Sequence, residues 1–177
     1  MGEVGSIKVS DVSAIIAGAK RPERTLELCL RADLVGALED AQRRLQAEAE
    51  RPRTSLGDAG DVDSIRAEVE RIKEEAKEHT IVFRFRALNH YEVQQLVADL
   101  PPREGNKADK MLGFNQDALT WNLFQKCCYE PALSDDDVVA LIGTVDEVGN
   151  GILSPSQWRR LDETLDSLNF AARDIPF

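Results

Sequence analysis

The chain has 177 residues, of which 42% are hydrophobic, and a formal net charge of −10. This length allows a single domain with a modest core, and no apolar run approaches the roughly 20 residues that span a bilayer. An acidic chain repels the phosphates of nucleic acids, which need a basic face. We therefore expect no membrane span and no nucleic-acid partner.

The first part of the chain, residues 1–23, reads as an N-terminal segment with a short helix. It shows no basic start followed by a long apolar stretch and a cleavage motif, which a secretory signal would need. We therefore expect a cytoplasmic protein.

The second part, residues 24–88, is bracketed by two segments of alternating character. In the first, Leu26, Leu28 and Leu30 alternate with more polar neighbours. In the second, residues 80–88, Ile81, Phe83 and Phe85 lie on one face, and Arg84 and Arg86 lie on the other. Period-two alternation is typical of strands with one buried face. We expect these strands to pair as a two-stranded antiparallel ribbon.

Two helices are predicted between these strands. Apolar residues recur at helical spacing over residues 34–49 and again over residues 62–79, where the steps of three and four indicate a coiled-coil seam. Residues 51–61, rich in Pro, Gly and small polar residues, break both patterns, so the helices can fold back as an antiparallel hairpin. The hairpin is a candidate for self-association. Its seam residues, which pack either internally or between subunits, are Val62, Ile65, Val69 and Ile72.

The third part, residues 89–177, reads as an acidic helical bundle that covers the ribbon. One face of its first predicted helix carries Tyr91, Val93, Leu96, Val97 and Leu100, and the pair of prolines at 101 and 102 ends that helix. Later helices are predicted near residues 116–127, 134–145 and 155–168, with Ser134 and Ser154 as N-caps. The expected fold is thus mainly helical α+β, in one overall domain. Two further candidate partner-binding residues lie in this part, Trp121 and Trp158.

Charge is uneven along this third part. Residues 130–177 hold ten acidic and three basic residues, a local balance of −7. Two interpretations stay open: a solvated helical surface, or an acidic platform that holds a basic or amphipathic helix.

No catalytic or metal-binding pattern stands out. Cys29, Cys127 and Cys128 match neither a disulfide framework nor a metal-ligand spacing, and His79 and His90 have no partner at zinc-like spacing. We therefore predict no enzyme activity, no cofactor and no metal.

One segment, Asp146 to Gln157, partly follows the layout of a calcium-binding EF-hand loop. However, Val148 occupies the third position, where an oxygen ligand belongs, and Gln157 replaces the final bidentate Glu. We interpret the segment as a helix-ending glycine turn followed by the Ser154 N-cap, and judge it non-functional as a metal site.

The order of these elements resembles the tail assembly chaperones of long-tailed, siphovirus-type actinobacteriophages. The front half carries the likeness in residues 24–31, the helical arm and residues 83–88. The rear half carries it in residues 101–104, 112–115, 130–135 and 174–177. The glycine-rich turn at 146–151 departs from the pattern.

The resemblance implies a non-enzymatic helper, in the cytoplasm of the infected bacterium, that binds the tape measure protein and keeps it soluble during tail tube assembly. It also implies contact with the major tail tube protein, self-association, and absence from the mature virion. Three alternatives stay open: a structural tail component of the terminator or connector type, a generic acidic interaction adaptor, and a calcium-binding adaptor built on the Asp146 loop.

Overall fold

The computed structural model describes residues 9–51 and 61–171, and side chains from residue 12 onward. Within these ranges the chain forms eight helices and one three-stranded antiparallel sheet, so the fold is mainly helical α+β. Among the described helices, none combines the length and apolar character needed to cross a membrane.

The sheet is built around the predicted ribbon. β1 (Glu23–Cys29) pairs antiparallel with β2 (Thr80–Arg86), and the register places Leu26 opposite Phe83. The side chains of Leu26, Leu28, Phe83 and Phe85 are buried on one face, whereas most of the alternate residues are exposed. The predicted strand pairing and its buried face are therefore confirmed.

The sheet has a third strand that the sequence did not predict. β3 (Cys128–Glu130) pairs antiparallel with β2, placing Glu130 opposite Arg84, and the register shifts between Arg84 and Phe85. The expectation of a two-stranded ribbon is thus wrong in strand number. Three residues directly after a helix are too few to show period-two alternation.

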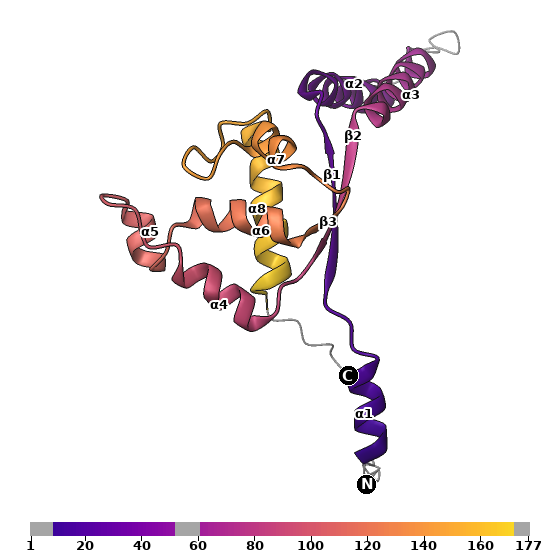
Figure 1. Ribbon diagram of the computed structural model, residues 1–177. Helices are drawn as coiled ribbons and strands as arrows, with labels where there is room; N and C mark the ends of the chain where they lie inside the picture. The colour runs from indigo at the N-terminus through magenta and orange to yellow at the C-terminus, as the bar shows by residue number, and fades with distance from the viewer. Residues whose placement is uncertain (1–8, 52–60, 172–177) are drawn as a thin grey trace.

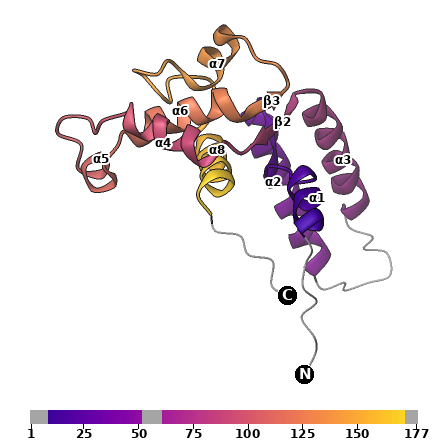
Figure 2. The same cartoon turned by 60° about the horizontal axis from the view of Figure 1, so that its bottom comes forward.

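The predicted helical hairpin is present. α2 (Ala32–Glu50) and α3 (Val62–Glu78) pack against each other beyond one end of the sheet, as Figures 1 and 2 show. The residues between them, 52–60, lie outside the described part. The hairpin has a small core of its own around Ala41, which is fully buried, and Val69 and Ile72 pack on it.

Five helices form the rear region: α4 (His90–Ala98), α5 (Lys107–Leu112), α6 (Gln116–Cys127), α7 (Asp135–Ile142) and α8 (Pro155–Asn169). They lie on one side of the sheet, as Figure 1 shows. α8 contacts both α6 and β1, which places it directly against the sheet. The opposite face of β1 and β2 is exposed and carries charged side chains.

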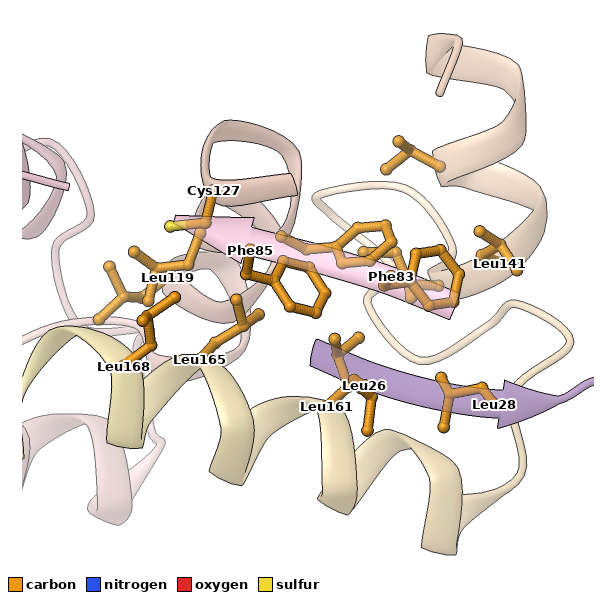
Figure 3. Close-up of a cluster of buried hydrophobic side chains, with 14 of the residues drawn as sticks. Leu26, Leu28, Phe83, Phe85, Leu119, Cys127, Leu141, Leu161, Leu165 and Leu168 are labelled. Carbon is orange, nitrogen blue, oxygen red and sulfur yellow. The ribbon is translucent and has the colours of Figure 1, made fainter. Parts of the chain in front are cut away.

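The main core lies between the sheet and helices α6 and α8. Three aromatic rings meet there, with Phe83 and Phe124 edge to face at 5.6 Å between centroids and Phe85 at 5.9 Å from Phe124. Figure 3 shows Leu161 and Leu165 of α8 pointing toward these rings. Burial of this apolar surface is what fixes the rear helices on the ribbon.

An ion pair between the buried Asp109 and the partly exposed Arg103 organises the connection between α4 and α6. The Asp109 side chain, only 1% exposed, accepts two hydrogen bonds from the Arg103 guanidinium at 2.6 and 3.0 Å. Arg103 also reaches Asp117 at 2.8 Å. The charged residues of this connector therefore order it and help to hold the short helix α5.

Candidate functional site

An apolar groove runs between α4 and the end of α8. It encloses about 580 Å³. Its lining residues are Leu88, His90, Val93, Gln94, Val97, Ala98, Asn169 and Phe170. Hydrophobic side chains thus make most of its surface, with a few polar groups among them, as in many binding sites.

Helix α4 forms one wall because its sequence has two apolar stripes. Leu96 turns into the main core and is buried, while Val93 and Val97 are half-buried and line the groove. The start of α4 is fixed by a capping box: Asn89 accepts from the Glu92 amide at 2.8 Å, and Glu92 accepts from the Asn89 amide at 2.7 Å.

The other wall depends on Asn169, which links three parts of the chain. Its Oδ1 accepts from the backbone amide of Leu88 at 3.0 Å, and its Nδ2 donates to the carbonyl of Leu165 at 2.9 Å. The same amide group lies near the Cys127 thiol. These contacts hold the end of α8 against the start of α4, and they leave Phe170 46% exposed in the groove.

An acidic side chain, Asp166, lies near the groove. Glu92 and Asp99 lie on the face of α4 opposite to the lining residues, and Glu92 pairs with Arg21 at 3.1 Å. Asp166 precedes Phe170 by one turn of α8. Burial, and then the nearby Asp162, raises the pKa of the Asp166 carboxyl above its ordinary value.

This arrangement is suited to binding. The groove, with α4 as one wall and Phe170 at the end of α8 in the other, fits the apolar stripe of a helix from another segment or chain. The Asp166 carboxylate would favour a basic residue beside that stripe. In the described ranges, no three His, Cys, Asp or Glu side chains gather closely enough to hold a metal ion.

The calcium-loop segment serves a structural purpose. Gln157, at the last ligand position, is buried; its Oε1 accepts from the Ser154 amide at 2.9 Å, and its Nε2 donates to the carbonyl of Cys29 at 2.5 Å. Gly151 lies against the backbone of α7, where a Cβ atom would be 2.2 Å from the Leu141 oxygen. Gln157 thus serves the fold through its hydrogen bonds, and Gly151 serves it through close backbone packing.

The four hairpin residues selected from the sequence fall into two pairs. Val69 and Ile72 are buried in the hairpin core against Ala41, whereas Val62 and Ile65 are half-buried toward the far end. A hollow at that end is lined mainly by charged residues, including Arg44, which pairs with Glu68 at 2.8 Å. Val69 and Ile72 therefore pack within the chain, whereas Val62 and Ile65 stay candidates for self-association.

The two tryptophans lie apart from the groove lining. Trp121 of α6 donates its indole N–H to the Gly143 carbonyl at 2.9 Å, and Trp158 of α8 packs on the main core. Both are half-buried. They fix the rear helices, and their exposed parts remain open to a partner.

Sequence reasoning predicted α4 but not the groove. It placed Tyr91 on the buried face, which is wrong, because Tyr91 is 68% exposed. Val93 and Val97 lie beside Leu96 on the helix, yet both line the groove, and only Val97 also packs on the main core. The period of the apolar residues locates a helix but does not tell which neighbour covers each residue.

The comparisons with known proteins give no relative. No family model, curated protein or solved structure that was compared matches the chain. The functional argument therefore depends on the residues themselves.

Proposed function

We propose that this chain is a non-enzymatic assembly chaperone that binds a long helical client, the tape measure protein of a long-tailed phage. Its place of action is the cytoplasm of the infected bacterium, and it leaves before the virion is complete. The observation that carries the proposal is the apolar groove between α4 and α8, with Phe170 partly exposed in it.

The groove supports helical clients in particular. A client that exposes long apolar helical stripes aggregates unless another protein covers them. The wall provided by Val93 and Val97 presents side chains at helical spacing, which matches an apolar stripe spaced at three and four residues. Many copies of the chaperone along one long client would cover many such stripes.

Charge supports the same partner. The chain carries a net charge of −10, and Asp166 lies one turn of α8 before the lining residue Phe170. These negative charges attract basic residues beside the client stripe and keep the loaded complex soluble through mutual repulsion. The order of elements, which resembles that of tail assembly chaperones, agrees with this assignment.

Affinity capture tests the proposal. The protein is captured from cells producing the phage that encodes it, and both the captured chains and purified particles are identified by mass spectrometry. We expect one very long helical protein in the capture and no copy of this chain in particles. Its presence in particles would instead indicate a structural tail component, and a capture without a long helical protein would contradict the client assignment.

A further inference from the structure

The helix α1 (Val9–Ala17) presents apolar side chains to solvent. Val12, Ile15 and Ile16 are 42%, 64% and 68% exposed. Figure 1 shows α1 beyond the end of the sheet, separate from the rear helices. Exposed apolar side chains at this spacing form a stripe that a partner surface can cover.

The base of α1 is held in place. Arg21 pairs with Glu92 at 3.1 Å, and the Pro22 carbonyl accepts from the Ala87 amide at 2.9 Å, which continues the strand pairing of β1. These two contacts hold the base of α1 at the end of the sheet, and Figure 1 shows α1 continuing beyond that end. The exposed apolar side chains of α1 are therefore accessible to a second molecule.

The α4–α8 groove matches α1 in length and apolar character. α1 and the wall helix α4 each have nine residues. The α1 stripe is apolar, like most of the groove lining. A helix with this pattern fits the mode in which an amphipathic helix occupies an apolar groove.

We propose that α1 of a second copy of this chain docks in the α4–α8 groove, so that copies self-associate and cover the groove until a client helix displaces α1. The displacement step rests on the proposed function, whereas the self-association does not. The contact joins two different surfaces, because the helix of one copy enters the groove of another.

Substitution of the stripe tests the self-association. Ile15→Asp combined with Ile16→Asp removes two apolar anchors, and we expect the apparent dissociation constant to rise by about 100-fold or more. The matched control combines Met111→Asp with Ile152→Asp, two residues that are 89% and 61% exposed outside both surfaces. Mass is measured by light scattering over a range of concentrations. A monomeric wild type, or equal loss in both variants, would overturn the proposal.

Cross-linking tests the site. In a Cys29→Ser background, a copy with Ile16→Cys is mixed with a copy carrying Gln94→Cys in the groove, and disulfide-linked dimers are expected. Pairing Ile16→Cys with Glu39→Cys on α2 is the control. The native thiols should stay unreactive, because burial raises the pKa of Cys127 and raises that of Cys128 to about 11.

The same reagents separate the possible failures. When both substitutions are in one chain, a bond formed only within monomers would show that α1 occupies its own groove, which contradicts the proposal. The Ile15→Asp, Ile16→Asp variant should still capture the client, and more strongly than the wild type. If that variant loses self-association and neither protein captures a client, the proposed function fails while the contact between copies stands.

Discussion

Gly151 provides a sharp test of how the turn after α7 is packed. A Cβ atom at this position would be 2.2 Å from the Leu141 carbonyl oxygen and 2.4 Å from the Ile142 nitrogen, both backbone atoms. Since neither atom can rotate away, Gly151→Ala must push the turn off the helix. Two hydrogen bonds hold it there, from the Ile152 amide to Ala140 at 3.0 Å and from the Leu153 amide to Leu141 at 3.3 Å.

The expected loss of stability follows from these contacts. Overpacking costs about 1–3 kcal/mol, and two weakened hydrogen bonds cost about 1 kcal/mol each, so Gly151→Ala should lower the free energy of unfolding by about 3 kcal/mol or more. For a chain of this size the melting temperature should fall by about 6–12 °C. Thermal and urea unfolding, followed by circular dichroism, measure both quantities.

Gly36 is the matched control. It lies inside α2, and a Cβ atom there would meet nothing within 4 Å. Gly36→Ala should therefore stabilise the protein by about 0.5–1 kcal/mol through helix propensity. If Gly151→Ala stayed within about 0.5 kcal/mol of the wild type, the close backbone approach, and the structural role given to the calcium-like loop, would be refuted.

Three further outcomes are expected. Hydrogen bonding from Arg103 holds the pKa of Asp109 below its usual 3.8. The ionised Asp109 therefore stabilises the fold above pH 3.8, and this stabilisation is lost as the pH falls below 3.8. The difference in unfolding free energy between the wild type and Asp109→Asn should accordingly become smaller in acid titrations below pH 3.8. Asn89→Ala removes the α4 capping box and should cost about 1 kcal/mol in urea unfolding, an effect that an equally stable variant would contradict. The Cys128 thiol should ionise with a pKa of about 11 by ultraviolet absorbance, and a midpoint near 9 would refute its burial.

Local patterns in the sequence predicted most of the secondary structure. Alternation located β1 and β2, and helical spacing located α2, α3 and α8. Cap residues were equally informative: Ser134 and Ser154 are the N-caps that were expected, each within a capping box, and Pro101 follows the end of α4. These features depend on neighbours in the chain, which is why one sequence is enough to find them.

Features that depend on contacts between distant segments were not predictable in the same way. The strand β3 exists because Cys128 and Glu130 meet β2, about 45 positions earlier. The groove requires Asn169 to reach the Leu88 amide, 81 positions away. Asp109 is charged, and its burial is favourable only because Arg103, a residue beyond its own helix, pairs with it. The groove, rather than any motif, carries the candidate site.

The groove claim is tested most directly by one substitution in a purified binding titration. Phe170→Asp places a charge in the groove, whereas Tyr91→Asp alters an exposed aromatic residue on α4 outside the lining. With a soluble helical fragment of the tape measure protein, we expect Phe170→Asp to weaken binding by about 10- to 100-fold and Tyr91→Asp to leave it unchanged. Equal affinity of the wild type and both folded variants would contradict the groove as the client site.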